Sequence, residues 1–229
     1  MIDDLDALWA YVENLTRRVD PHSDLPPVMG GGQTHRPRLA LVFINPTHRN
    51  ASTRNGWAGP RYPFIGTKAV WRVLAQGQLL PATVADEIVS RPTWDEEFAA
   101  SVYSRVEASS LYLTNLVKWT GPTGDLPSGA MVKTYADILR RELELVCPEA
   151  VVAFGGLTYR ALTGEAVRLS DVLQTVRTEG RVPSSRSRFG IPVYPCYFPV
   201  GRGNPRSAAE ILAALTRSLE VARNGAPEV

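Results

Sequence analysis

The segment LALVFINPTHRN, residues 39–50, decides how the rest of the chain is interpreted. It begins with apolar and β-branched side chains, and this run stops abruptly at Asn45 and Pro46. The pattern predicts a buried strand that ends in a polar side chain. In an open α/β sheet, ligands bind outside the carboxyl ends of the strands. We therefore expect functional chemistry directly after this strand.

Later segments repeat the same pattern between stretches of helical periodicity. Strands are predicted at residues 39–45, 110–116, 150–154 and 192–198, and helices between and after them, including residues 130–146 and 205–222. Strands that alternate with helices indicate a mainly parallel sheet covered on both faces. The sequence predicts one α/β domain over residues 1–229, with a four-stranded sheet, an N-terminal helix at residues 3–18 and a core at residues 39–222.

Length and composition describe an ordinary globular protein. The chain has 229 residues, 44% of them hydrophobic and 21% charged, which is enough for one domain with a full core. No apolar run is long enough to span a membrane, and the acidic start is unlike a secretion signal. The two cysteines, Cys147 and Cys196, are too few for a four-cysteine metal site. We expect a cytoplasmic monomer without metal or cofactor.

The basic residues are nearly all arginine. Three of the 25 basic residues are lysines, so 22 are arginines, although the net charge is only +2. Arginine suits bidentate recognition of phosphate groups. The excess equally suits a genome rich in G and C. Placement in the loops after strands therefore matters more than the total.

Five segments fall at or between the predicted strand ends in a distinctive order. They are FINPTH (residues 43–48), YPFIG (62–66), LYLTN (111–115), PEAVVAFGG (148–156) and CYFPVGRGNPR (196–206). This ordered set resembles the uracil-DNA glycosylase superfamily over roughly residues 39–212. The resemblance implies a four-stranded parallel α/β domain that hydrolyses the N-glycosidic bond of a flipped-out base in DNA, with no cofactor.

The resemblance also implies a role for three side chains. Asn45 would position the attacking water, Phe64 would stack on the flipped base, and Asn115 would recognise the pyrimidine edge through its amide. An amide suits an asymmetric base edge because it offers a donor and an acceptor together. Each residue also has a plainer interpretation. The two asparagines suit turns after strands, and Phe64 suits an ordinary core.

Two phenylalanines depart from the family pattern. Phe43 stands where the family usually has glycine, and Phe198 replaces the late histidine that stabilises the leaving base. Both are expected beside the base. His48 matches the histidine of the Asp-Pro-Tyr-His turn of uracil-specific members, so it is the candidate for assisting the leaving base, ahead of His22 and His35. A lone histidine in a loop is more often structural.

Thr47 bears on the choice of substrate. Uracil-specific members of the family hold a tyrosine at this place, which blocks substituents on the pyrimidine C5 atom, and threonine is much smaller. The resemblance therefore implies a pocket for uracil or a bulkier C5-modified base, such as the glucosylated hydroxymethylcytosine of phage DNA. The biological role would be base repair or defence against phage.

Residues 200–206 combine glycines, arginines and a predicted helix start. Backbone amides at a helix N-terminus bind phosphate readily, and Val200 or Arg202 is suited to enter the gap left by a flipped nucleotide. The alternative is a plain surface turn. The residues expected to contact DNA are Arg49, Arg61, Lys118, Val200, Arg202, Asn204 and Arg206.

Two other functions remain open. The missing late histidine is compatible with a catalytically inactive protein that binds DNA or modified bases. A hydrolase of free nucleosides or nucleotides would need the same pocket. Abasic product on DNA separates a glycosylase from both alternatives.

Overall fold

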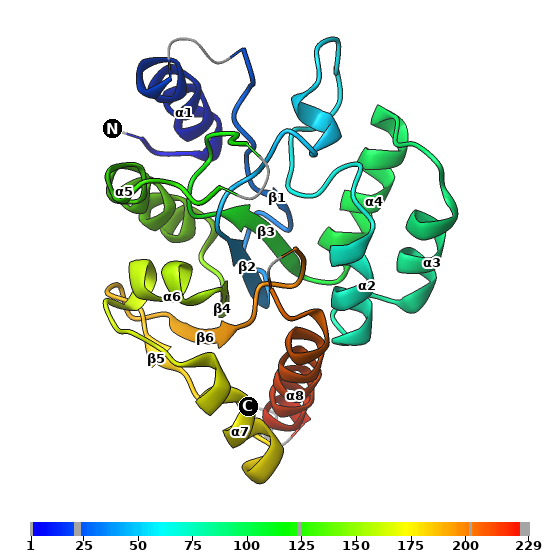
Figure 1. The fold of residues 1–229 in the computed structure, drawn as a ribbon, viewed down its shortest axis with the longest axis vertical. Helices are drawn as coiled ribbons and strands as arrows, with labels where there is room; N and C mark the ends of the chain where they lie inside the picture. The colour runs from blue at the N-terminus through cyan, green and yellow to red at the C-terminus, as the bar shows by residue number, and fades with distance from the viewer. Residues whose placement is uncertain (1, 21–23, 123–124, 202, 225–229) are drawn as a thin grey trace.

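A computed structural model describes residues 2–20, 24–122, 125–201 and 203–224. Within them, eight α-helices surround one sheet whose strand order is β1-β3-β2-β4-β6-β5 (Figure 1). The four central strands are parallel: β2 (Leu39–Phe43), β3 (Leu111–Asn115), β4 (Ala150–Phe154) and β6 (Pro192–Cys196). The predicted α/β architecture is therefore confirmed.

The sheet has six strands rather than the four predicted, because two short strands are added at its edges. Gly31–Gly32 form β1 and Ser185–Arg186 form β5, and each pairs antiparallel with a parallel strand at one edge of the sheet. Two-residue strands leave no alternating pattern in the sequence, because alternation needs several side chains. These strands cap the edges that β3 and β6 would otherwise expose.

The helices divide between the two faces of the sheet. One face packs against α1 (Leu5–Val19), α5 (Gly129–Val146) and α6 (Gly156–Thr163). The other packs against α2 (Ala69–Gln76), α3 (Ala82–Ser90), α4 (Glu96–Ala108), α7 (Leu169–Glu179) and α8 (Pro205–Asn224). None of the helices in the described segments is long and apolar enough to cross a membrane.

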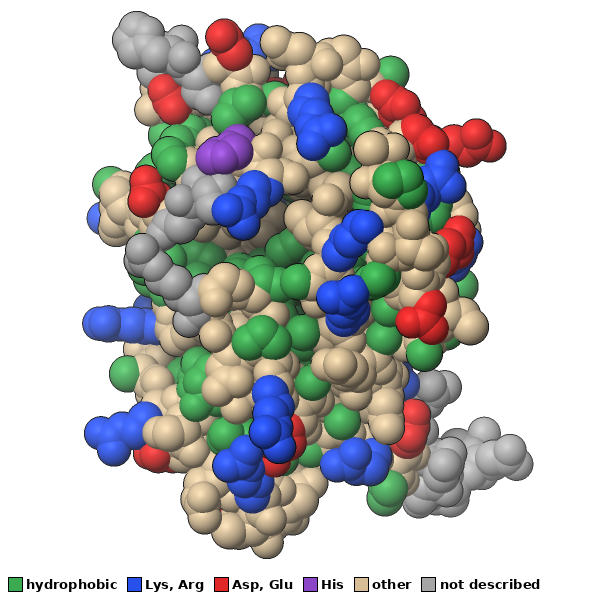
Figure 2. All heavy atoms as spheres, turned by 45° about the vertical axis from the view of Figure 1, so that its right-hand side comes forward, with side chains coloured by type: hydrophobic (Ala, Val, Ile, Leu, Met, Phe, Trp, Pro, Cys, Tyr) green, Lys and Arg blue, Asp and Glu red, His purple; other side chains and the backbone are tan. Residues whose placement is uncertain are grey.

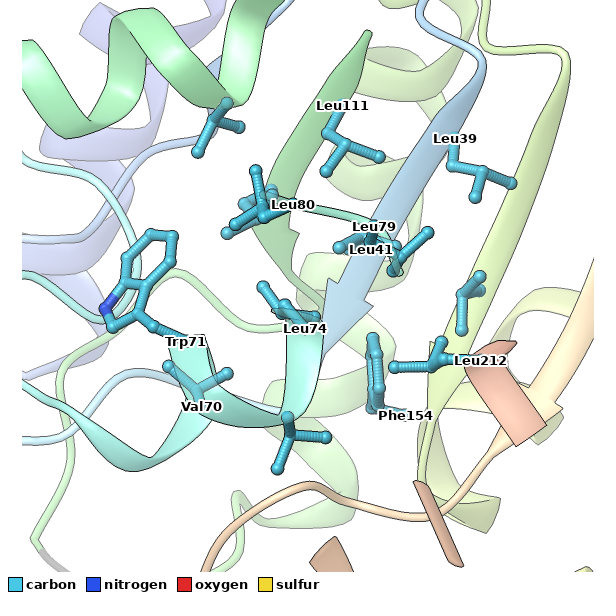
Figure 3. Packing of buried hydrophobic residues seen from close by; sticks show 14 of the residues in the cluster. Leu39, Leu41, Val70, Trp71, Leu74, Leu79, Leu80, Leu111, Phe154 and Leu212 are labelled. Carbon is cyan, nitrogen blue, oxygen red and sulfur yellow. The ribbon is translucent and has the colours of Figure 1, made fainter. Parts of the chain in front are cut away.

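The alternation of side chains along β2 divides the core in two. Leu39, Leu41 and Phe43 belong to the cluster on the α2 and α8 side, and Ala40 and Val42 belong to the cluster on the α1 and α5 side. Successive side chains of a strand point to opposite faces, so one strand supplies both layers. Figure 3 shows side chains of the first cluster converging from the sheet, α2 and α8.

The local signals that begin and end the helices match their positions. Asp4 caps α1 by accepting a 2.8 Å hydrogen bond from the Ala7 backbone amide, so this helix starts at Leu5 rather than at residue 3. At the C-terminus of α5, Cys147 adopts a left-handed conformation with φ of 54°, and the helix ends before Pro148.

Leu41 gives a direct test of the core. It is fully buried at the centre of the sheet, so Leu41→Ala should lower the free energy of unfolding by about 2–5 kcal/mol through lost burial and a cavity. Urea unfolding followed by circular dichroism measures this loss. Leu126 is 68% exposed, so Leu126→Ala is the control and should change the free energy by less than about 0.5 kcal/mol. Equal losses in the two variants would contradict the described packing.

Candidate functional site

The carboxyl ends of β2 and β3 lie side by side at one edge of the sheet. Phe43 is the register partner of Asn115, and the pairing continues beyond both strands. The Leu116 amide donates to the Phe43 carbonyl at 2.7 Å, and the Val117 amide donates to the Ile44 carbonyl at 2.9 Å. The continued pairing holds the segment leading to Asn45 against the segment that follows Asn115.

Asn115 is buried, with an incomplete set of hydrogen bonds. Its side chain is 1% exposed, and Nδ2 has no hydrogen-bond partner among the described residues. A buried amide donor without a partner costs roughly 1–3 kcal/mol. The side chain lies on the same face of the sheet as Phe43, because register partners in adjacent parallel strands share a face. An unfilled donor at a strand end suits a ligand that accepts a hydrogen bond.

Phe64 packs against Phe43, the register partner of Asn115, and has a strained backbone conformation. Its φ is 62°, in the left-handed region that costs non-glycine residues about 1–2 kcal/mol. The Phe64 carbonyl accepts hydrogen bonds from the Thr67 amide at 3.1 Å and from Trp71 Nε1 at 3.3 Å. Its half-buried ring meets the Phe43 ring edge to face, with centroids 4.5 Å apart. Strain of this kind persists where the surroundings over-determine the conformation, often at functional sites.

Phe43 lies beneath the site and does not line it. Its side chain is fully buried and stacks on Phe154 at 4.4 Å between ring centroids. The half-buried Phe198 ring stands perpendicular to it at 6.3 Å. The contact of Phe43 with a base stays a prediction; in the structure the last position of β2 points into the core. Phe43 instead forms a floor against which Phe64 and Phe198 pack.

The turn after β2 is joined to the loop after β3 by backbone hydrogen bonds. Thr47 forms a parallel bridge with Gly121, whose amide donates to the Pro46 carbonyl at 3.1 Å. The half-buried Asn45 donates from Nδ2 to the same Pro46 carbonyl at 3.1 Å. This bond orients the amide of Asn45 and leaves Oδ1 as its acceptor. A Cβ at Gly121 would stand 2.5 Å from the Trp119 ring and 3.3 Å from Asn45 Nδ2, so glycine permits the close approach.

His48 and Arg49 continue the same turn with exposed side chains. The His48 amide donates to the Gly121 carbonyl at 3.3 Å, so the backbone of this residue belongs to the fastened part of the turn. His48 thus lies three residues beyond Asn45 on the outer side of the loop.

A second set of hydrogen bonds ties this turn to the Phe64 segment. The buried Asn50 donates from Nδ2 to the Tyr62 carbonyl at 2.8 Å and accepts from the Ser52 amide at 3.1 Å. The Ala51 amide donates to the Ile65 carbonyl at 2.8 Å. Sequence reasoning did not single out Asn50. The available signal was its place in an irregular loop of small and polar residues, where asparagine commonly organises turns.

Lys118 lies inside the protein, behind the end of β3. The side chain is fully buried and forms an ion pair with Glu142, which is also fully buried. Burial lowers the pKa of the Lys118 ammonium, and the Glu142 carboxylate opposes that shift. The phosphate contact of Lys118 stays a prediction; in the structure the lysine turns inward behind the end of β3. It does not point outward to the rim, by which we mean the edge of the sheet where β2 and β3 end.

The turn that follows β6 is compact. The Asn204 amide donates to the Phe198 carbonyl at 3.0 Å, and a Cβ at Gly203 would lie 1.8 Å from that carbonyl oxygen. Asn204 also caps α8 by accepting from the Ser207 amide at 3.1 Å, and the half-buried Val200 packs against the core. The helix therefore begins at Pro205, as the sequence predicts.

The remaining arginines differ in their surroundings. Arg206 is exposed in the first turn of α8, and Arg61 Nη1 lies 4.0 Å from Glu13 Oε1. Arg202 lies outside the described residues. Figure 2 shows basic side chains recurring across the middle of one face, with acidic ones mainly toward its margins, and a recess beside hydrophobic side chains.

Two defined surface hollows lie away from this rim. One has a volume of about 580 Å³ and is lined by Arg38, Leu79 and Ser110 among others, near the amino ends of β2 and β3. The other is lined by residues of α3 and α4. Neither hollow is lined by the side chains gathered at the carboxyl ends of β2 and β3.

The fold and the rim define an α/β protein with aromatic rings and two asparagine amides at the carboxyl ends of adjacent strands. The family model of the Uracil DNA glycosylase superfamily matches residues 29–216, which include this rim and all the parallel strands. The chain belongs to the uracil DNA glycosylase superfamily, whose members are DNA glycosylases. No curated protein sequence matches it.

Asn50 allows a test of the joined loops. Asn50→Ala should lower the free energy of unfolding by about 1–3 kcal/mol, because the Tyr62 carbonyl and the Ser52 donors lose their buried partner. Denaturant unfolding measures the loss, and hydrogen exchange should show faster opening of residues 62–66. Asn55→Ala, at an exposed position of the same loop, is the matched control. Unchanged exchange in Asn50→Ala would show that the two loops are held independently.

Proposed function

We propose that this protein is a monofunctional DNA glycosylase that acts as a monomer on a flipped-out pyrimidine and leaves an abasic site. The observation on which this rests is the buried Nδ2 of Asn115, which has no partner among the described residues. Asn115 is the register partner of Phe43, and the ring of the strained Phe64 packs against the Phe43 ring. A pyrimidine carbonyl is a suitable acceptor for that donor. Membership of the superfamily supports DNA as the substrate.

In the proposed reaction, hydrolysis of the N-glycosidic bond does not require a strong general base from the protein. Cleavage of an N-glycosidic bond passes through an oxocarbenium-like sugar, as glycoside hydrolysis does. Because a base stacked in a duplex is out of reach, the enzyme first extrudes it into the site. Asn45 has an amide oriented by the Pro46 carbonyl, and its Oδ1 is suited to hold a water. An amide cannot take a proton from water at neutral pH, so catalysis relies on placement and preorganised polarity.

Departure of the base requires a group that stabilises the negative charge developing on it, and Phe198 stands where the family has a histidine for this role. The half-buried Phe198 carries no hydrogen-bonding group, so it can pack against a base but cannot stabilise the charge that develops on it. His48 is the nearest histidine in sequence to Asn45 and lies on the same fastened turn. We assign it this role within the proposal.

DNA binding is proposed for the exposed parts of the rim. Arg49 and Arg206 present exposed guanidinium groups on the turn after β2 and at the start of α8. Arg61, Val200 and Asn204 border the same segments. Phosphate contacts by arginine fix the register of a protein on DNA and weaken as salt rises.

The decisive experiment measures alkali-labile abasic sites on defined oligonucleotides under single-turnover conditions. The wild-type protein should produce them, and Asn45→Ala should slow their formation by roughly two to three orders of magnitude, since a preorganised polar group is lost. Asn14→Ala, on an exposed position of α1, is the control and should match the wild type.

Each other result selects a different function. Binding to DNA without abasic product would identify an inactive binding protein. Release of bases from free nucleosides but not from DNA would identify a nucleoside hydrolase. A near wild-type rate for Asn45→Ala would remove this residue from the mechanism.

The substrate is proposed to be uracil or a bulkier C5-modified pyrimidine, such as glucosylated hydroxymethylcytosine, in repair or in defence against phage. Support comes from Thr47, a small, half-buried residue on the turn beside Asn45. Mass spectrometry of the bases released from uracil-containing and phage-modified DNA would identify the substrate.

Thr47→Tyr tests the space available at the C5 atom. The larger ring should reduce excision of C5-substituted bases relative to uracil by about 10- to 100-fold, because a filled pocket excludes the substituent. The ratio of the two single-turnover rates is the measurement. Thr47→Ser keeps the side chain small and should preserve the wild-type ratio. An unchanged ratio in Thr47→Tyr would place the C5 substituent elsewhere.

A further inference from the structure

A fully buried cluster of charged and polar side chains stands directly behind Asn115. Lys118, Glu142, Thr114 and Tyr112 all have no exposed surface. Tyr112 alternates with Leu111 and Leu113 and belongs to the core on the α1 and α5 side, whereas Asn115 shares the face of Phe43. The cluster and the Asn115 amide therefore lie on opposite faces of the same strand end.

The hydrogen bonds of this cluster are complete. Lys118 Nζ has three protons and meets three acceptors, which are Oε2 of Glu142, Oγ1 of Thr114 and the Asn115 carbonyl oxygen at 2.6 Å. Oε1 of Glu142 accepts from the Thr114 hydroxyl at 2.7 Å and from the Tyr112 hydroxyl at 2.8 Å. The Lys118 ammonium also lies 5.8 Å from the Trp9 ring centroid. All three ammonium protons and both carboxylate oxygens of the ion pair therefore have hydrogen-bond partners.

Simple stabilisation does not account for a charged pair in this place. Removing two charges from water costs several kcal/mol for each ion, and apolar side chains of similar volume are often as stabilising or more so. What the ion pair provides that apolar packing does not is a charged donor on the backbone carbonyl of Asn115. That carbonyl belongs to the peptide unit linking Asn115 to Leu116, whose amide is bound to Phe43.

We propose that Lys118 and Glu142 are positioning residues, which clamp the peptide unit of Asn115 and so set the direction in which its side-chain amide meets the substrate base. The inference rests on the proposed function, since it assigns the support of the base-reading residue. Lys118 is placed by Glu142 and Thr114, and it fixes the Asn115 carbonyl from behind. The amide on the other face then keeps one orientation although its Nδ2 has no protein partner among the described residues. A displacement of about 1 Å in such a group can reduce a reaction rate about 100-fold.

A double variant separates positioning from stability. Lys118→Met alone leaves the Glu142 carboxylate buried without its partner and should be strongly destabilised. Lys118→Met combined with Glu142→Gln removes both charges and keeps an acceptor for Tyr112 and Thr114, so its urea midpoint should return toward that of the wild type. Single-turnover excision by the double variant should nevertheless stay about 10- to 100-fold below the wild type. A purely structural ion pair predicts that activity returns together with stability.

A second readout does not depend on activity. The side-chain amide of Asn115 gives a pair of nuclear magnetic resonance signals in isotope-labelled protein, which Asn115→Ala identifies by their loss. In the double variant these signals should shift and broaden. Thr114→Val, which keeps both charges and nearly the same shape, should have a smaller effect in the same direction. Tyr135→Phe is the matched control, because it removes a buried hydroxyl of α5 that bonds to Thr16 outside the cluster; it should leave excision and the Asn115 signals unchanged.

The outcomes are distinct. Excision within twofold of the wild type in a double variant with restored stability, or unchanged Asn115 signals in Thr114→Val, would overturn the positioning role. If the wild-type protein releases no base from any DNA, the proposed function fails instead, and the amide signals alone decide whether the ion pair orients Asn115.

Discussion

The pairing of β2 with β3 is the constraint on which the rest of the structure depends. It aligns Phe43 with Asn115 and continues past both strands through Leu116 and Val117. Parallel strands bring their carboxyl ends to one edge, so two segments about seventy residues apart in the chain deliver their amides to the same place. The turns beyond that edge are then fastened to one another, first through Thr47 and Gly121 and next through Asn50 and Tyr62.

The two faces of the β2–β3 strand pair differ in chemical character. On the α2 and α8 side, Phe43 and Phe154 form an apolar floor, and Phe64 and Phe198 stand at its border. On the α1 and α5 side, Lys118 and Glu142 form a closed polar cluster. A base placed beside Asn115 would therefore meet aromatic surface on the protein's outer side, while the charges stay shielded behind the sheet. This separation suits a reaction in which polar groups act by fixed orientation rather than by proton transfer.

The packing of Phe43 and Phe198 gives a physical interpretation of the two positions at which this chain differs from the family pattern. Phe43 stands where the family pattern has a glycine, and its buried ring packs against the Phe64 ring. Phe198 replaces a histidine and completes the aromatic border with a ring that cannot donate a hydrogen bond. Phe43 thus adds apolar packing beneath the rim, and Phe198 makes its border more apolar.

The sequence by itself determined the parallel α/β core and the order of the strand-end motifs, because apolar runs and helical periodicity are local signals. The edge strands β1 and β5 escaped prediction, since two residues show no alternation. The inward turn of Lys118 also escaped, because its partner Glu142 is 24 residues away on α5. Only the tertiary structure decided which of the motif side chains gather at the strand ends, which pack beneath them and which are buried on the opposite face of the sheet. Burial and pairing depend on neighbours that are distant along the chain, and no local pattern records them.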